Sequence, residues 1–262
     1  MNLRSYFGAI RRIILCSLYR RPIELGGTGP VISFSFDDFP RTAYSVAGAI
    51  LEKYGVRGTY YVASGLMNKI DHLGEQFHAD DLHALRDGGH DLGSQTFSHI
   101  SSRSASCAAF REDVQRGREV LEKLTGVDGG NFAYPYGHVT LKTKRILGPA
   151  LTSSRSIIPG FNGPEVDLNL LKANRLYGGL DQSRYAEGLI LENAKRKTWL
   201  IFYTHDVCPE PSIYGCTPAL FEATVSAAVR SGSRILTIQQ VLSERGVQAW
   251  NRKGQFCLAG VR

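Results

Sequence analysis

Two adjacent carboxylates, Asp37 and Asp38, follow directly on the apolar run VISFSF, residues 31–36. Neighbouring carboxylates repel each other unless a cation or a proton relieves the repulsion. One of the two could therefore hold a metal ion while the other stays free as a general base. The competing interpretation is turn chemistry, because aspartate is common where a strand gives way to a loop. For this stretch taken alone, the turn is favoured.

A second polar cluster lies in the stretch DLGSQTFSHI, residues 91–100, where an apolar strand is expected to end. It places Gln95 four residues before His99. Histidine is a frequent metal ligand, and a second histidine at the position of Gln95 would complete half of a metal site. A single histidine is more often a surface or core residue than a ligand, so His99 alone is a weak signal.

Two further segments add a proton donor and a rigid turn. His205 follows the apolar run TWLIFYT, residues 198–204, and a histidine there is suited to proton transfer near neutral pH. The YPYG segment, residues 134–137, combines a rigid proline with a permissive glycine, which lets backbone N–H groups turn toward a ligand. Each of these signals is weak by itself.

Strand-like and helix-like segments alternate after residue 29 and would position the four clusters. The expected strands are 31–37, 58–63, 90–95, 131–135, 150–154, 198–205 and 234–238, and the clearest helices are 107–125 and 218–230. Strands separated by helices imply parallel pairing, and seven or eight such units in one domain favour an α/β barrel over a sandwich. The carboxyl ends of barrel strands share one mouth, which would collect all four clusters.

The order of the clusters is more specific than any one of them. SFDD, then QTFSH, then FAYPYG and then LIFYTH resembles the polysaccharide deacetylase, or NodB-homology, domain of carbohydrate esterase family 4. The segments LEKYGVRGTYYVA and GGHDLGSQTFSH are also similar to that family. The resemblance implies a distorted (β/α)7-8 barrel, with residues 30–245 as one deacetylase domain. A basic amphipathic segment, residues 1–29, would precede the domain, and a tail, residues 246–262, would follow it.

Carried over position by position, the resemblance implies roles for four side chains. Asp37 would be the catalytic base that deprotonates the attacking water, and His205 would be the general acid that protonates the departing amine. Asp38 and His99 would bind a divalent metal, with Zn²⁺ as the expected ion. Such a cation lowers the pKa of a bound water and polarises the carbonyl under attack.

The resemblance also implies a site for the oxyanion that forms during the reaction. The metal and the backbone N–H of Tyr136 would hold it, in the turn that Pro135 and Gly137 flank. A fixed amide donor of this kind can lower a barrier by ~3–4 kcal/mol.

The sequence departs from the family pattern at three places. Gln95 stands where the family has a histidine ligand; its carbonyl oxygen is a poorer zinc ligand than imidazole, and its other use would be to hold a water beside the metal. Ala133 stands where the family has an arginine that orients the base, unless Arg155 or Arg175 reaches in from elsewhere. The family's later motif with aspartate and tryptophan is not recognisable, and Asp167 is a low-grade candidate for it.

Composition bounds the remaining classes of function. A hydrophobic content of 43% is enough for a sizeable core, and the net charge of +7 favours an anionic partner. Nucleic acid is the weakest such partner, because no RNA-binding motif or zinc finger is found. The odd number of five cysteines, without a CxxC pair, indicates reduced thiols in a cytosolic compartment. Cys208 and Cys216, in a loop that would shape substrate access, are expected to be small buried hydrophobes.

The first 21 residues form a basic, apolar segment. The run IILCSLY, residues 13–19, is short for a signal peptide, and two arginines follow where a cleavage site would be expected. On a helix, one stripe would contain Leu3, Phe7, Ile10, Ile14 and Leu18, with arginines largely off it. That arrangement is typical of a helix lying on anionic lipid; the alternative is a stripe that packs on the domain or stays disordered. We expect a cytoplasmic protein that contacts the inner face of the membrane through residues 1–21.

Three functions therefore stay open. The first is a metal-dependent deacetylase that removes the N-acetyl group of a sugar in a polysaccharide or glycolipid precursor. The second is a glycan-binding homologue that keeps the cleft without turnover. The third is a metal-independent amide hydrolase of the same fold. The presence together of Asp37, Asp38, His99 and His205 favours the first, because a hydrophobic core needs none of them and buried unpaired charge is costly.

Overall fold

The main sheet of the molecule is parallel and has the strand order of an open, distorted barrel. The computed structural model describes residues 12–27 and 29–247. The strands of this sheet are β2 (Val31–Phe36), β3 (Thr59–Val62), β6 (Asp91–Ser94), β7 (Asn131–Ala133), β8 (Ser153–Arg155), β10 (Asn174–Arg175), β11 (Trp199–Thr204) and β12 (Arg234–Ile235). Their order is β10-β11-β2-β3-β6-β7-β8, and β12 pairs with the beginning of β2. The predicted distorted (β/α) barrel is confirmed.

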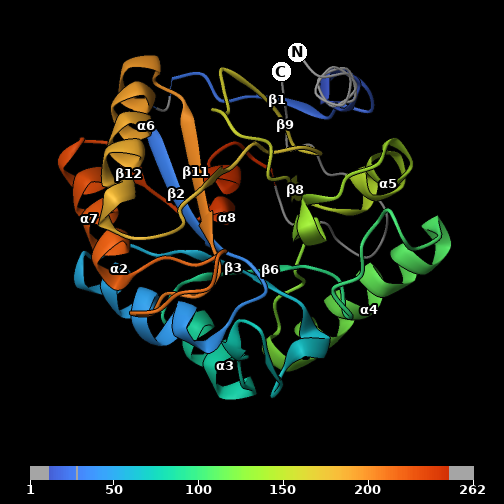
Figure 1. Ribbon diagram of the computed structural model, residues 1–262. Helices are drawn as coiled ribbons and strands as arrows, with labels where there is room; N and C mark the ends of the chain where they lie inside the picture. Colours follow the sequence, from blue (N-terminus) through green and yellow to red (C-terminus); the bar gives the residue numbers. More distant parts are fainter. Residues whose placement is uncertain (1–11, 28, 248–262) are drawn as a thin grey trace, which may run out of the picture.

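Most of the helices surround this sheet on its outside, as Figure 1 shows, and the last one packs with residues of the inner face. These helices are α2 (Ala49–Lys53), preceded by the π-helix η1 (Ala43–Gly48), α3 (Ala79–Asp87), α4 (Cys107–Thr125), α5 (Leu141–Leu147), α6 (Ser183–Arg196), α7 (Pro218–Arg230) and α8 (Ile238–Ser243). Two small antiparallel pairs lie apart from the sheet: β1 (Pro22–Glu24) with β9 (Glu165–Asp167), and β4 (Ile70–Asp71) with β5 (Gly74–Glu75). Short 3-10 turns, among them η3 (Pro135–Gly137), connect the elements.

Capping residues explain why the bounds of two helices, α4 and α7, are predicted correctly from the sequence. Ser106 Oγ accepts a hydrogen bond from the backbone N–H of Ala109 at the start of α4, and Gly126 ends that helix in the left-handed conformation (φ 75°). Thr217 caps α7 in the same way, by accepting from the N–H of Leu220, with proline at the first helical position. Both helices have the predicted bounds, 107–125 and 218–230.

Other segments differ from the sequence prediction because charged residues are buried in them. The strand expected at 150–154 is β8, which begins three residues later than expected and ends one residue later, on the fully buried Arg155. Helix α5 has a buried cation on its inner face, since Lys144 is 0% exposed and donates to Asp167 Oδ2 (2.7 Å). A buried arginine and lysine interrupt the apolar periodicity by which strands and helices are recognised.

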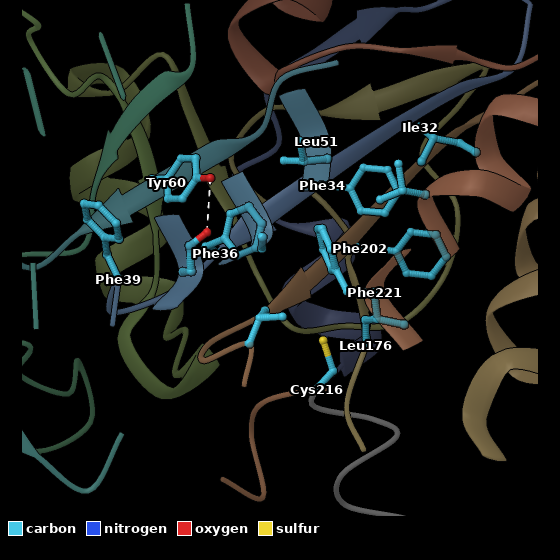
Figure 2. Close-up of a cluster of buried hydrophobic side chains, with 14 of the residues drawn as sticks. Ile32, Phe34, Phe36, Phe39, Leu51, Tyr60, Leu176, Phe202, Cys216 and Phe221 are labelled. Carbon is cyan, nitrogen blue, oxygen red and sulfur yellow. Dashed lines mark hydrogen bonds between the residues drawn. The ribbon is translucent and has the colours of Figure 1, made fainter. Parts of the chain in front are cut away.

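The outer face of the sheet carries an aromatic core against the helices, which Figure 2 shows. The ring of Phe34 stacks with Phe202 (5.8 Å between centroids) and meets the edge of Phe221 (5.6 Å). Phe36, two residues on and therefore on the same face, stacks on Tyr60 (4.5 Å). These contacts fix the end of β2, after which the two predicted carboxylates come.

The inner face of β2 carries small polar side chains that are also buried. Ser33 and Ser35 are at most 1% exposed. Ser33 Oγ accepts from Trp199 Nε1 (2.9 Å) and donates to the carbonyl oxygen of Leu236 (2.6 Å), while Ser35 Oγ donates to that of Phe202 (2.8 Å). Their small volume leaves room inside the barrel for the large side chains of neighbouring strands.

Ahead of the sheet, residues 12–17 are helical and rest against α5 and the loop after β9. Leu15 is the member of this helix that is buried (8% exposed), in a cluster with Phe110 and Phe132. None of the helices within residues 12–27 and 29–247 combines the length and the apolar composition needed to cross a bilayer.

A half-buried aspartate at the beginning of β6 makes folding sensitive to pH. Asp91 Oδ2 accepts hydrogen bonds from Thr59 Oγ1 (3.0 Å), Gln239 N (3.2 Å) and Asn131 Nδ2 (3.4 Å), which ties β3, β7 and α8 to β6. Burial outweighs these bonds and raises the pKa of Asp91 to about 6. The stabilisation that this proton provides is therefore fully present below the unfolded pKa of ~3.9 and lost as pH rises through about 6.

We expect Asp91→Asn to remove this loss, because the amide stays neutral while keeping an acceptor oxygen. Relative to wild type, its free energy of unfolding should improve by about 2–3 kcal/mol between pH 4 and pH 7. Urea unfolding of both proteins at a series of pH values measures the difference. If the free energies of unfolding of Asp91→Asn and wild type differ by the same amount at every pH, the prediction is contradicted.

Candidate active site

The strands bring the four predicted clusters to one end of the sheet. Asp37 and Asp38 follow β2, Gln95 follows β6, Tyr136 follows β7 and His205 follows β11. β2 and β11 are paired with Phe36 opposite Thr204, and the backbone N–H of Asp37 donates to the carbonyl oxygen of Thr204 (2.9 Å). The proposed base and the proposed acid are therefore the next residues on two adjacent strands.

Asp37 is held by an arginine from the far edge of the sheet. Arg155 Nη2 donates to Asp37 Oδ1; the arginine is 0% exposed and the aspartate 4%. The rings of Tyr61 and Tyr203 flank the guanidinium, with centroids at 5.1 and 5.0 Å. Burial acts to lower the pKa of Arg155, but Asp37 outweighs it and holds that pKa above its ordinary value. The pair is therefore ionic.

Arg155 takes the place of the arginine that the family has at the position of Ala133. In the β7–β8 ladder, Ala133 is directly opposite Arg155. A side chain from position 155 thus enters the barrel beside position 133 and reaches the same carboxylate. Arg175, the other candidate, is an exposed residue at the end of β10. Sequence alone offered both, and strand register decides between them.

Asp38, Gln95 and His99 form the second half of the site. Gln95 Oε1 accepts from the backbone N–H of Asp38 (2.9 Å), so the amide presents its Nε2 to His99 Nε2 (3.3 Å). Asp38 Oδ1 lies 2.8 Å from the same imidazole nitrogen. Burial acts to raise the pKa of Asp38, but His99, and then His205 and His72, lower it below the ordinary value. Asp38 is therefore an anion at neutral pH.

The contact between Asp38 and His99 is one that a cation would satisfy. Asp38 Oδ1 is buried and has no aligned hydrogen-bond donor, although the imidazole nitrogen is close. If His99 Nε2 is unprotonated and accepts from Gln95 Nε2, the anionic Asp38 Oδ1 lies against an imidazole nitrogen that has no proton to donate. If His99 Nε2 carries a proton, that proton lies close to the N–H donor of Gln95 instead. A carboxylate oxygen and an imidazole nitrogen converging in this way fit a divalent metal.

The donor set is nevertheless smaller than the usual one. Within the described part of the chain, no group of three or more His, Cys, Asp or Glu residues is placed to hold a metal ion. Gln95 offers its oxygen to a metal only if its amide turns over and releases the N–H of Asp38. Its role as a ligand stays a prediction, and its observed role is to position Asp38.

Strained backbone is concentrated at this end of the sheet. Eight non-glycine residues among those described have positive φ, and five of them surround the site: Asp38, Phe39, Thr96, His99 and Tyr136, with φ between 55° and 65°. A left-handed conformation costs a non-glycine residue about 1 kcal/mol or more. Such positions persist only where the surrounding contacts impose them, and they are typical of functional sites.

The loop after β11 fixes the orientation of His205. His205 Nδ1 lies 3.1 Å from the carbonyl oxygen of Tyr214, which makes Nδ1 the donor and leaves Nε2 for proton transfer. Asp206, 3% exposed, folds the loop by accepting from Ser212 N (2.7 Å) and Ser212 Oγ (2.6 Å). Ser212 Oγ in turn accepts from the N–H of Tyr214 (3.1 Å). Apart from the Pro, Ser and Gly content of the loop, nothing in the sequence indicates these hydrogen bonds among Asp206, Ser212 and Tyr214.

Aromatic side chains flank both halves of the site. Tyr136 is 58% exposed and its ring lies 4.6 Å from that of His99. On the other side, the rings of Tyr177 and Tyr214 lie 6.0 and 5.6 Å from His205. The ends of the site therefore offer exposed aromatic faces around a polar centre.

Three other candidates lie away from the chemistry. Asp167 accepts from Lys144 Nζ (2.7 Å) and from the N–H of Arg21 (2.9 Å), so it joins β9 to α5 and the N-terminal segment instead of reaching His205. Cys216 is a buried core residue whose pKa burial raises to about 12. Burial also raises the pKa of the Cys208 thiol. Both cysteines are free thiols; Cys216 is buried as expected, whereas Cys208 is half-buried with its thiol 3.7 Å from Asp206 Oδ2, so the expectation of burial is wrong for Cys208.

Comparison with known proteins agrees with this architecture. Residues 26–149 match the family model described as polysaccharide deacetylase, which covers the segments of Asp37, Asp38, Gln95 and His99. The resemblance recognised in the sequence is therefore confirmed for this part of the chain, which is a polysaccharide deacetylase domain. No curated protein matches the sequence.

Solved structures of the same family share the fold at low identity. PdaA of Bacillus subtilis, a family 4 carbohydrate esterase, is 15% identical with a TM-score of 0.55, over 89% of each chain. A family 4 acetyl xylan esterase from Clostridium thermocellum, in complex with a cobalt ion, is 17% identical with a TM-score of 0.53, over 83% of this chain and 93% of the other.

The same fold also occurs without the activity. BA3943 of Bacillus anthracis, described as a family 4 pseudoenzyme, is 12% identical with a TM-score of 0.50, over 82% of this chain and 66% of the other. The shared fold alone therefore does not imply turnover, which depends on the side chains of the site.

Removing the buried arginine should destabilise the protein strongly. Arg155→Ala leaves Asp37 charged and unpaired inside the barrel, and we expect a loss of about 3 kcal/mol or more in the free energy of unfolding. Ala133→Arg in the same protein returns a guanidinium to the vacated space and should recover part of that loss. Chemical denaturation of wild type, the single variant and the double variant measures it.

The exposed Arg175→Ala is the matched control and should stay within ~0.5 kcal/mol of wild type. A double variant no more stable than Arg155→Ala would contradict the inference that positions 133 and 155 serve the same carboxylate.

The loop that holds His205 should not tolerate a methyl group at position 215. A Cβ on Gly215 would lie 2.3 Å from Asp206 Oδ1, so Gly215→Ala must displace that carboxylate. We expect a fall of several degrees in melting temperature and lower activity. Gly188→Ala is the control, because its Cβ meets nothing within 4 Å in α6 and should stabilise by up to ~1 kcal/mol. Equal melting temperatures for the two variants would contradict this account of the loop.

Proposed function

We propose that this protein is a deacetylase that hydrolyses the N-acetyl group of a sugar in a glycan or glycolipid precursor, assisted by a divalent metal. The observation that carries the proposal is the buried Arg155–Asp37 pair, with Asp37 and His205 as the next residues after two paired strands. It places a carboxylate held by a buried guanidinium next to an imidazole whose orientation is fixed. A base and an acid on neighbouring strands are the two groups that amide hydrolysis requires.

Asp37 acts as the general base in this proposal. The buried guanidinium of Arg155 donates to Asp37 Oδ1, which keeps the carboxylate in place. The carboxylate receives a proton from the attacking water as the carbon–oxygen bond forms. The carbon–nitrogen bond then breaks, and the amine leaves as a neutral group only if it gains a proton.

His205 supplies that proton. Its Nδ1–H donates to the carbonyl oxygen of Tyr214, so the imidazolium form carries the transferable proton on Nε2, and loss of that proton leaves a neutral ring protonated on Nδ1. Because Asp206 folds the loop that carries Tyr214, the position of the acid depends on a second carboxylate that does not touch it.

Asp38 and His99 would hold the metal through Oδ1 and Nε2. When bound there, a divalent metal supplies Lewis-acid polarisation of the acetyl carbonyl. Tyr136 would add a backbone donor for the developing oxyanion, because its N–H makes no hydrogen bond within the described part of the chain. With Gln95 in place of a third strong ligand, we expect weaker binding of Zn²⁺ than a site with two imidazoles would give.

The side chains around the site favour a sugar as the substrate. Sugar rings have apolar faces and polar edges, and exposed aromatic rings such as Tyr136 and Tyr214 suit the apolar faces. The flanking histidines and carboxylates suit the hydroxyl and acetamido groups.

One observation favours a second function, glycan binding without turnover. The amide of Gln95 is turned so that a nitrogen instead of an oxygen faces His99, which weakens the metal site. A homologue of this kind would keep the aromatic edges and lose hydrolysis. Metal content separates the two functions before any substrate is chosen.

We expect purified wild type to contain about one equivalent of divalent metal, and Asp38→Ala to contain none, by elemental mass spectrometry. Gln95→His should bind zinc more tightly than wild type in a competition with a chelating dye. Absence of metal from wild type together with uptake by Gln95→His would support the binding homologue instead. A hydrolase whose turnover survives removal of metal would support the metal-independent alternative.

Acetate release from N-acetylglucosamine oligomers tests the catalytic roles. Asp37→Asn and His205→Gln should each lower kcat by about 10²-fold or more, because each removes a proton acceptor or donor, with little change in oligomer affinity. The control is Asp167→Asn, in the structural pair with Lys144, which should affect stability and leave kcat unchanged. Unchanged kcat in Asp37→Asn would remove Asp37 as the base.

A further inference from the structure

The segment that precedes the barrel presents an apolar face to solvent. Ile13 and Ile14 are 64% and 40% exposed, and Leu18 and Tyr19 are 47% and 46% exposed. On a surface helix whose outer side faces water, such positions are typically polar, because only apolar side chains that face the core are removed from water. We call the four residues the N-terminal apolar face.

This face is held outward by contacts on the other side of the segment. Leu15 packs into the core, Lys144 Nζ donates to the carbonyl oxygen of Leu15 (2.7 Å), and Asn169 Nδ2 donates to that of Tyr19 (2.9 Å). Of the predicted stripe, Leu3, Phe7 and Ile10 lie outside the described residues, and Ile14 and Leu18 are both exposed. The buried residue is Leu15, which lies off that stripe.

Cations accompany the apolar face. The guanidinium of Arg145 on α5 lies 5.9 Å from the ring of Tyr19, and Ile146 beside it is 36% exposed. Arg12, at the start of the described helix, is exposed. Residues 1–21 contain five arginines and neither aspartate nor glutamate, so they carry five of the seven net positive charges of the chain.

The combination of apolar exposure and cationic charge selects the partner. A polyanion in solution would favour the arginines and leave Ile13, Ile14 and Leu18 in water. An apolar protein surface would cover the isoleucines and gain nothing from the arginines. The surface of an anionic bilayer offers both, because acyl chains lie directly beneath charged headgroups.

We propose that the N-terminal apolar face inserts into the surface of an anionic lipid bilayer and holds the protein there peripherally. The helix lies parallel to the membrane, with Leu15 on the protein side and Ile13, Ile14 and Leu18 on the lipid side. Since Leu15 belongs to the same cluster as Phe110 and Phe132, the contact orients the whole barrel on the membrane. The proposal does not depend on whether the barrel hydrolyses an acetyl group.

Cosedimentation of the full-length protein with vesicles tests the proposal. Wild type should bind vesicles that contain phosphatidylglycerol and phosphatidylcholine, and bind at least about tenfold less to phosphatidylcholine alone. Ile13→Ser with Leu18→Ser should reduce binding to the anionic vesicles by at least about tenfold, since both side chains lose their apolar surface. Arg12→Gln with Arg145→Gln should weaken binding and reduce its dependence on salt.

The matched control replaces two apolar residues of similar exposure elsewhere. Leu191 and Val229 are 61% and 43% exposed on α6 and α7, and Leu191→Ser with Val229→Ser should bind vesicles as wild type does. Thermal melts of all variants verify folding. Wild type that ignores anionic vesicles, or Ile13→Ser with Leu18→Ser that binds them equally, would overturn the proposal. So would a dimer in sedimentation velocity that the same two substitutions dissociate, because the face would then bind a second copy.

Discussion

The buried ion pair of Arg155 and Asp37 is the interaction on which the site depends. A guanidinium at 0% exposure is tolerable only when it is paired and enclosed by rings, as Tyr61 and Tyr203 enclose it. The pair spans the barrel interior from β8 to β2, two strands that are not neighbours in the sheet. It therefore sets the position of the base and joins the edge strand of the open barrel to its centre.

The sequence predicts the framework of this site better than its interior. Strand ends, the caps of α4 and α7, and the gathering of Asp38, His99 and His205 at one mouth follow from local patterns and from the topology of parallel sheets. The reach of Arg155 depends on its register with Ala133, which no local pattern records. The orientation of His205 depends on the carbonyl oxygen of a loop residue, and backbone groups are the same at every position.

Backbone conformation explains why the Gln95 amide has the orientation observed. Asp38 is left-handed (φ 60°), and its N–H points to Gln95 Oε1. An imidazole at position 95 could accept from that N–H through a ring nitrogen or, after ring rotation, offer a nitrogen to a metal. A glutamine has one oxygen near this turn and uses it on the backbone. The departure from the family pattern therefore changes what supports Asp38 as well as what binds a metal.

The position of the arginine also bears on how such a barrel can diverge. Starting from a homologue with arginine at the position of Ala133, the present arrangement needs two substitutions. If arginine enters at 155 first, two guanidinium groups crowd one carboxylate in a dry interior; if arginine leaves 133 first, the carboxylate is alone. Each intermediate is less stable than either end state, so the residues at 133 and 155 should be inherited as a linked pair.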